Sequence, residues 1–79
     1  ARTGRRAEAL ADFSRAIQID PNYVQALSNR ALVHRQSGRV DLALADYNRA
    51  ITADPNYAAA YVGRGNVYRT TNRLAEALS

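Results

Sequence analysis

The residues that could support catalysis or bind a metal ion are few and scattered in this sequence. It contains one histidine, His34, and no cysteine, so the usual zinc ligand sets are excluded. A nucleophile would need a positioned base beside it, and we expect His34 instead to pack between helices with a hydrogen bond. None of the seven acidic residues forms a carboxylate pair isolated among apolar residues, as acid–base catalysis requires. The sequence therefore predicts a protein that is not an enzyme and uses no metal or other cofactor.

Most acidic residues can be explained by local structure. Asp41 follows a turn glycine and is expected to cap the N-terminus of a helix. Asp12 and Asp46 each precede an arginine by three residues, the spacing of ion pairs on a helix surface. Asp20 and Asp54 are followed by proline, which favours a role in a turn over calcium binding, because calcium needs several nearby oxygen ligands.

The basic residues are all arginine, and they give the chain a formal net charge of +4. Most of them recur at one constant spacing, in four sets: Arg5/Arg39/Arg73, Arg15/Arg49, Arg30/Arg64 and Arg35/Arg69. A row of arginines can bind carboxylates or phosphates through two parallel hydrogen bonds, or it can simply be a solvated surface. The charge balance alone leaves both protein and nucleic-acid partners open.

These arginine sets belong to a longer internal repeat. The tetrapeptide Asp20-Pro21-Asn22-Tyr23 recurs at 54–57, and a shift of 34 positions makes 20 of the 45 overlapping residues identical. Proline cannot continue a helix and excludes the residue before it from helical geometry. The repeated tetrapeptide is therefore interpreted as a joint between structural units rather than as a binding site.

Each repeat unit has the apolar spacing of two helices. Apolar or small residues separated by three and four positions define one helix from Val40 (Val40, Ala43, Leu44, Tyr47, Ala50, Ile51) and another before it (Val24, Leu27, Ala31, His34). Gly38 lies between them, where a left-handed residue can end a helix, and Gly4 and Asn72 occupy the equivalent positions. The pattern predicts an all-α fold of antiparallel helix pairs with five helical segments and no strand.

The length of the chain, 79 residues, allows one small domain with a thin core. No apolar run approaches the roughly 18 to 20 residues of a membrane span, so no membrane association is expected. The first six residues are polar and basic and no apolar stretch follows them, unlike a signal peptide.

A helix–turn–helix repeat of this period with these small, aromatic and proline positions resembles the tetratricopeptide repeat. The resemblance divides residues 1–79 into a second helix of a partial repeat (1–23), a complete repeat (24–57) and a partial repeat with a first helix and the start of a second (58–79). It implies a right-handed superhelical α-solenoid, with Tyr47, Tyr61 and Tyr68 at core positions. The sequence departs from the family pattern at Arg30 and Arg64, where leucine is usual, and at His34, where tyrosine is usual.

The resemblance also implies a scaffold that binds a peptide or helix of a partner protein in a concave groove lined by first helices. Carried over by position, the groove residues are Gln25, Ser28, Asn29, Leu32, Arg35, Val62, Asn66 and Arg69, with Ala59 and Gly63 beside them. Apolar Leu32 and Val62 next to basic Arg35 and Arg69 suit an acidic amphipathic peptide. Ala59 and Gly63 stand where the chaperone-binding members of the family carry basic residues, so we do not expect a chaperone carboxylate clamp.

Two alternatives stay open. The basic charge could serve an RNA-binding helical repeat, although the aromatic residues expected among the cations of such a surface are assigned to the core here. The incomplete terminal repeats could instead make the chain a self-assembly module, a homo-oligomer joined through uncapped ends. We expect a protein partner rather than nucleic acid, because the Asp-Pro-Asn-Tyr joint is typical of the protein-binding family.

Overall fold

The computed structural model describes the backbone of residues 2–78 and the side chains of residues 5–72, and its described residues are helical apart from three short joints. The helices are α1 (Arg2–Ile19), α2 (Val24–Gln36), α3 (Val40–Ala53) and α4 (Ala58–Leu78). Helix α2 packs against α1, α3 and α4, and α3 also packs against α4. The predicted all-α solenoid of antiparallel helix pairs is confirmed.

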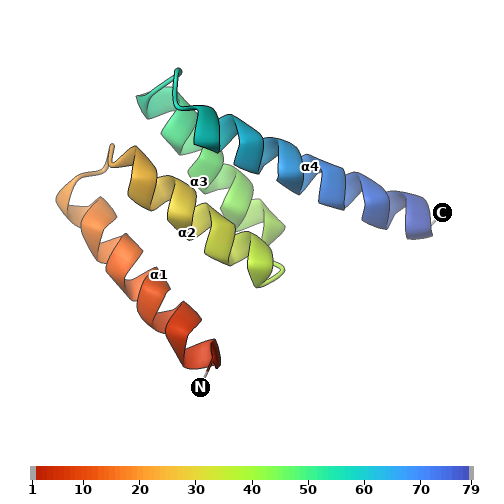
Figure 1. Cartoon of the computed structure of the whole chain (residues 1–79), viewed down its shortest axis with the longest axis horizontal. Helices are drawn as coiled ribbons and strands as arrows, with labels where there is room; N and C mark the ends of the chain where they lie inside the picture. The colour runs from red at the N-terminus through yellow and green to blue at the C-terminus, as the bar shows by residue number, and fades with distance from the viewer. Residues whose placement is uncertain (1, 79) are drawn as a thin grey trace.

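The helices form a flat stack. Figure 1 shows α1 and α4 on opposite sides of the α2–α3 pair, with the two ends of the chain away from that pair. The molecule measures 43 × 36 × 15 Å, so one of its dimensions is less than half of either of the others. This shape leaves one long face along which α2 and α4 lie as neighbouring first helices.

The two joints between repeat units have the same hydrogen bonds. The carboxylate of Asp20 accepts from the backbone N–H of Asn22 at 3.1 Å, and Asp54 accepts from Asn56 at the same distance. This Asx turn, followed by a backbone bond from each tyrosine to the aspartate carbonyl, reverses the chain after the proline. The prediction that the repeated tetrapeptide is a joint is confirmed.

The turn inside the central repeat depends on one left-handed residue. Gly38 has a φ of 79°, which costs glycine little and other residues much more. The N–H of Gly38 donates to the carbonyl of Arg35, and the N–H of Arg39 donates to that of His34 at 2.8 Å. These two bonds are the Schellman motif, which ends α2 and reverses the chain into α3.

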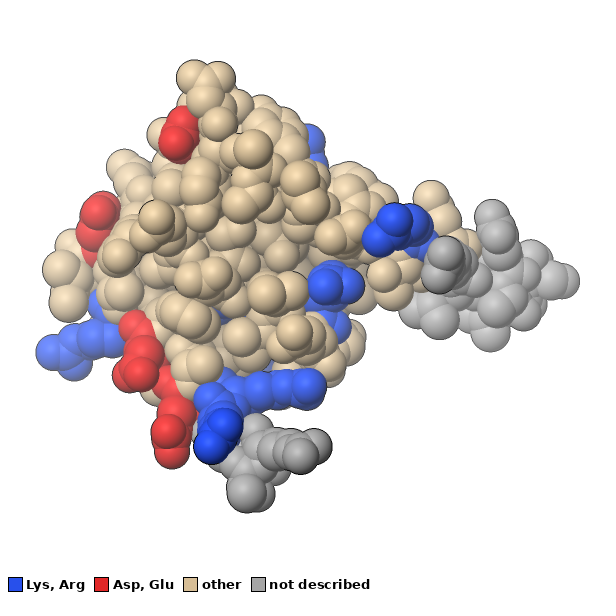
Figure 2. Space-filling model, viewed as in Figure 1, with Lys and Arg blue, Asp and Glu red and all other residues tan. Residues whose placement is uncertain are grey.

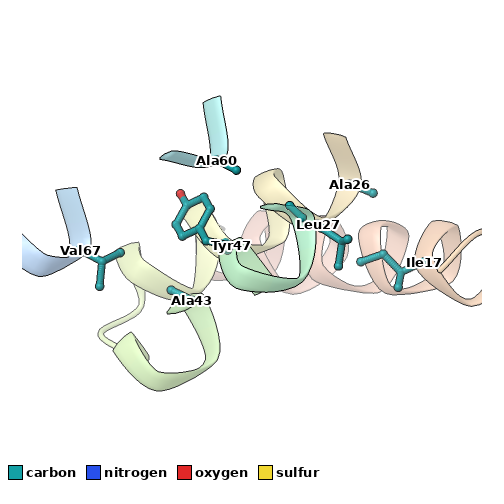
Figure 3. Packing of buried hydrophobic residues seen from close by; sticks show 9 residues of the cluster. Ile17, Ala26, Leu27, Ala43, Tyr47, Ala60 and Val67 are labelled. Atoms are coloured by element: carbon teal, nitrogen blue, oxygen red, sulfur yellow. The ribbon is translucent and has the colours of Figure 1, made fainter. Parts of the chain in front are cut away.

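The core consists of small and medium side chains from all the helices. Its buried members are Ile17, Ala26, Leu27, Ala31, Ala43, Tyr47, Ala50, Ala60 and Val67. Figure 3 shows Leu27 of α2 between Ile17 of α1 and Tyr47 of α3, while Ala60 and Val67 approach from α4. The five alanines allow the helices to approach closely, which is how a thin stack excludes water.

Two predicted turns, at Gly4 and at Asn72, are absent. Helix α1 runs through Gly4 and α4 runs through Asn72, so the described chain has four helices instead of five segments. A continuous helix keeps the backbone hydrogen bonds that a left-handed residue and a turn would interrupt. Among the described residues nothing packs on the outer side of α4, and Thr70 and Thr71 instead bond back to carbonyls of that helix. Ser79, in the predicted start of a further helix, and the side chain of Arg73 lie outside the described residues.

The outer side of α4 also explains a second correction. Tyr47 is 2% exposed as predicted, but Tyr61 and Tyr68, predicted as core residues, are 42% and 48% exposed. In α2 the equivalent positions are covered by α3, whereas no described helix covers them in α4. Helix α4 therefore presents an aromatic surface to solvent.

Asp41 does not cap α3. The N-cap residue is Arg39, which makes no side-chain capping bond, and Asp41 lies in the first helical turn. There its carboxylate interacts favourably with the positive end of the helix dipole, since the first turn carries unpaired N–H groups.

Among the described residues, no helix is long and apolar enough to cross a membrane, and no three His, Asp or Glu side chains are grouped to bind a metal ion.

Candidate functional site

A groove runs between α2 and α4, with α3 beneath it. Its volume is about 340 Å³, and its lining residues are Ser28, Asn29, Leu32, Arg35, Tyr47, Ala59, Val62, Gly63 and Asn66. Along each of α2 and α4, the lining residues recur about one helical turn apart, so they share one face of the helix. The two faces lie opposite each other because both helices present the same repeat positions. The groove is therefore a direct product of the sequence repeat.

The structure places six of the eight predicted groove residues in this lining: Ser28, Asn29, Leu32, Arg35, Val62 and Asn66. Gln25 and Arg69 are exposed and lie outside it. Arg69 nevertheless donates a 2.9 Å hydrogen bond to the side-chain oxygen of Asn66. That bond fixes the amide of Asn66 and leaves its NH₂ group to donate to another acceptor.

The base of the groove is an aromatic residue that the sequence pattern assigned to the core. Tyr47 is nearly buried, and its ring lies against the backbone of Gly63 so closely that a Cβ at Gly63 would overlap the ring. Figure 3 shows the ring directed toward α4. The signal in the sequence is the replacement of Asn29 by Gly63 at the equivalent position, which removes the side chain where the tyrosine must fit. Burial raises the pKa of Tyr47, so its hydroxyl is uncharged at neutral pH.

The wall of the groove combines apolar surface with one cation. Leu32 and Val62 are 38% and 63% exposed. Between the helices Arg35 is half-buried, and its Nε is buried without a hydrogen-bond partner among the described residues. This Nε has almost no accessible surface, so a ligand oxygen in the groove can approach Arg35 only through the rest of its guanidinium group. The groove can therefore accept an apolar side chain and a carboxylate close together.

Charge is unevenly distributed on the face drawn in Figure 2. Among the described residues, the acidic side chains visible there lie on the left half, whereas the part over α4 shows only basic ones. The centre of the face is uncharged. The basic side chains over α4 are therefore separated from the acidic ones on this face.

A partly buried ion pair joins three helices. Arg30 of α2 donates from Nε and Nη2 to the two carboxylate oxygens of Asp46 on α3, at 2.7 and 2.8 Å. Its Nη1 donates to the hydroxyl of Ser14 on α1 at 3.2 Å. Asp46 is 6% exposed, so the predicted surface pair between Asp46 and Arg49 is wrong. The local spacing indicated Arg49, but a bidentate partner on the next helix compensates a buried carboxylate much better.

Asp12, for which a surface pair with Arg15 was predicted, is exposed and forms no ion pair with Arg15 or with any other side chain that the structure describes.

The pairing of Arg30 with Asp46 also explains why arginine replaces the usual leucine at position 30. Because Asp46 is buried, an aliphatic residue at that position would leave its charge uncompensated.

His34 packs beside this ion pair, as expected, but without the expected hydrogen bond. Its Nε2 lies 3.9 Å from a carboxylate oxygen of Asp46, and its Nδ1 is buried without a partner in the described part of the chain. Burial lowers the pKa of His34, the Asp46 carboxylate opposes that change to a smaller extent, and the charges of Arg30 and Arg39 add to it. The imidazole is therefore neutral in the folded protein at neutral pH.

This lowered pKa predicts a pH dependence of stability. Below the ordinary histidine pKa of about 6.5 the unfolded chain binds a proton that the folded chain resists, so the free energy of unfolding decreases as the pH falls. The stability that comes from the neutral His34 is fully present at pH values above the pKa of histidine in the unfolded chain. Urea unfolding at about pH 7.5 and about pH 5.5 measures it, with His34→Tyr as the comparison because Tyr68 is the repeat equivalent. The variant should lose less stability than the wild type over this interval, and an equal loss in both would contradict the assignment.

Comparison with known proteins agrees with this geometry. The sequence model of the family described as tetratricopeptide repeat matches residues 1–58 and again residues 43–79, which together span the chain. Comparison with curated protein sequences gives no match.

Proposed function

The chain belongs to the tetratricopeptide repeat family, and from that premise we infer that it is a non-catalytic protein-interaction module whose α2–α4 groove binds an acidic, partly apolar peptide of a partner protein. The observation that carries this proposal is the juxtaposition, in one groove lining, of the cationic Arg35 and the exposed apolar side chains of Leu32 and Val62. Repeats of this family generally mediate protein–protein contacts, which supports a protein ligand.

The recognition follows from the chemistry of the lining. A peptide carboxylate would accept from the guanidinium group of Arg35, and Asn29 and the NH₂ group of Asn66 would donate to peptide carbonyls. An apolar peptide side chain would cover Leu32 and Val62 and remove their surface from water. Arg69, at the edge of the groove, would steer acidic peptides toward it, and salt would weaken that effect.

Reversal of the groove charges tests this proposal. On an array of short peptides matched in length and apolar content, the wild type should bind acidic peptides in preference to neutral and basic ones. Arg35→Glu with Arg69→Glu should weaken binding to acidic peptides by about tenfold or more, because like charges then face each other. Fluorescence anisotropy with the best acidic peptide measures the loss.

The matched control is Arg15→Glu with Arg49→Glu, which makes the same change of net charge at exposed positions of α1 and α3 outside the groove. This variant should keep the preference for acidic peptides. The groove assignment is wrong if both double variants lose binding equally, because net charge alone would then explain the preference. It is also wrong if the Arg35/Arg69 variant binds like the wild type.

A further inference from the structure

The groove between α2 and α4 contains one hydroxyl group that neither its apolar surface nor its cations explain. Tyr47 of α3 lies at the base of the groove, and its side chain occupies the space that a Cβ at Gly63 would need. The atoms of Tyr47 nearest to that space are Cζ, Cε1 and Oη, so the hydroxyl end of the ring is the part that reaches α4 (Figure 3). The glycine on α4 therefore leaves room for a hydroxyl at the floor of the groove.

This hydroxyl makes no hydrogen bond with any residue that the structure describes. The fully buried side-chain atoms that lack a partner are Nδ1 of His34 and Nε of Arg35, and Oη of Tyr47 is not among them. Although only 2% of Tyr47 is exposed, its Oη thus keeps some accessible surface, and the groove is the surface that Tyr47 lines. A ligand in the groove can accept the hydrogen bond that this hydroxyl is able to donate.

A cation lies close to the hydroxyl. Arg35 and Tyr47 line the same groove, and the charge of Arg35 opposes the rise in the pKa of Tyr47 that burial causes. The Nε of Arg35 has almost no accessible surface, so the rest of its guanidinium group is the part that a ligand can reach. A guanidinium beside a hydroxyl donor suits an anionic acceptor, because hydrogen bonds to a charged oxygen are the stronger ones.

The equivalent positions in the preceding unit lack this arrangement. Phe13 of α1 is the repeat equivalent of Tyr47 and has no hydroxyl, and Asn29 of α2 is the equivalent of Gly63 and carries a side chain. The hydroxyl is therefore present at the position where the facing residue has no side chain. Packing alone does not account for it, because phenylalanine would fill the same space without an unpaired polar group.

We propose that the hydroxyl of Tyr47 is a specificity-determining group of the groove, which donates a hydrogen bond to a side-chain carboxylate of the bound peptide beside the guanidinium of Arg35. This inference rests on the proposed function, because it requires a peptide in the α2–α4 groove. A side chain at position 63 would occupy the space of the hydroxyl, so Gly63 belongs to the same site. The two donors together fix where an acidic residue of the peptide lies, which net charge alone would not do.

Tyr47→Phe tests this proposal, because it removes the hydroxyl and keeps the ring. The probes are two short peptides with a neutral fluorophore at one end and an amide at the other, one of alternating leucine and glutamate and one with glutamine in place of each glutamate. In fluorescence anisotropy, the substitution should weaken binding of the glutamate peptide by about tenfold, because a hydrogen bond to a charged group is lost. Binding of the glutamine peptide should change by about twofold or less, since a neutral acceptor forms a weaker bond.

Tyr68→Phe is the matched control, because it removes a hydroxyl from an exposed tyrosine outside the groove lining. This variant should bind both peptides as the wild type does. Urea unfolding of Tyr47→Phe without peptide is a second measurement, and its midpoint should be equal to that of the wild type or higher, since the hydroxyl has no partner within the described chain.

Three results would overturn the proposal while leaving the proposed function intact. The first is a Tyr47→Phe variant that keeps the wild-type preference for the glutamate peptide, and the second is an equal loss of binding to both peptides. The third is a clearly lower urea midpoint for Tyr47→Phe, because the hydroxyl would then bond within the protein. If the wild type itself does not prefer the glutamate peptide, the proposed function fails and this inference fails with it.

Discussion

Asp46→Ala should lower the free energy of unfolding by about 3 kcal/mol, because it leaves the guanidinium of Arg30 inside the structure without a countercharge. The side chain of Arg30 is 20% exposed, so some water reaches it, and the effect should be at the lower end of the range for broken buried ion pairs. A domain of this size has only about 4 to 12 kcal/mol of stability, so the change removes a large part of it. Thermal unfolding should shift by about 10 °C or more.

Two further variants separate the ion pair from other causes. Asp12→Ala makes the same substitution at the equivalent position of the first repeat, where the carboxylate is exposed, and it should change stability by less than about 0.5 kcal/mol. Arg30→Met with Asp46→Leu removes both charges and should recover much of the loss, because apolar residues of similar volume need no countercharge. If Asp12→Ala were as harmful as Asp46→Ala, the buried position of Asp46 would not be the cause.

Leu27→Ala should be about as destabilising, at about 3 kcal/mol, through the loss of packing at the centre of the stack. Leu27 has no exposed surface and lies where α1, α2 and α3 meet. Removal of its three terminal carbons leaves a cavity that the rigid helices can fill only in part. Urea unfolding should show a lower midpoint with a nearly unchanged slope.

Leu42→Ala is the matched control for this packing effect. Leu42 is also on a helix of the central repeat, but it is 48% exposed. The same substitution there should cost less than about 0.5 kcal/mol, since little buried surface is lost and alanine favours the helix. Equal destabilisation at both sites would mean that helix propensity, and not burial, controls stability in this chain.

Local sequence signals correctly predicted the helices of the central repeat and the joints around them. Gly38 takes the left-handed conformation that only glycine adopts at little cost, and Asp20 and Asp54 form their Asx turns with residues two positions later. Interactions of this kind involve neighbours in the chain, so residue type and spacing are sufficient to identify them. Six of the eight predicted groove residues line the groove for the same reason, because one helical period places them on one face.

Predictions that depended on neighbouring helices were less accurate. Spacing along one helix paired Asp46 with Arg49, but α2 offers Arg30, which forms two short bonds in a site with little water. The sequence could not indicate that Tyr47 reaches beneath the groove, because that position depends on the approach of Gly63 from α4. It also could not indicate that α4 continues through Asn72, because asparagine is found inside helices as well as in turns.

The sequence by itself determined the repeat, its period, the all-α architecture and the membership of the family. The tertiary structure alone decided which charges are buried and which surfaces stay uncovered. Helix formation and turn formation depend on interactions over a few residues, which a single sequence displays directly. Burial depends on which helices meet, and the different environments of Asp46 and Asp12, or of Leu27 and Tyr61, arise because equivalent residues have different neighbours in the stack.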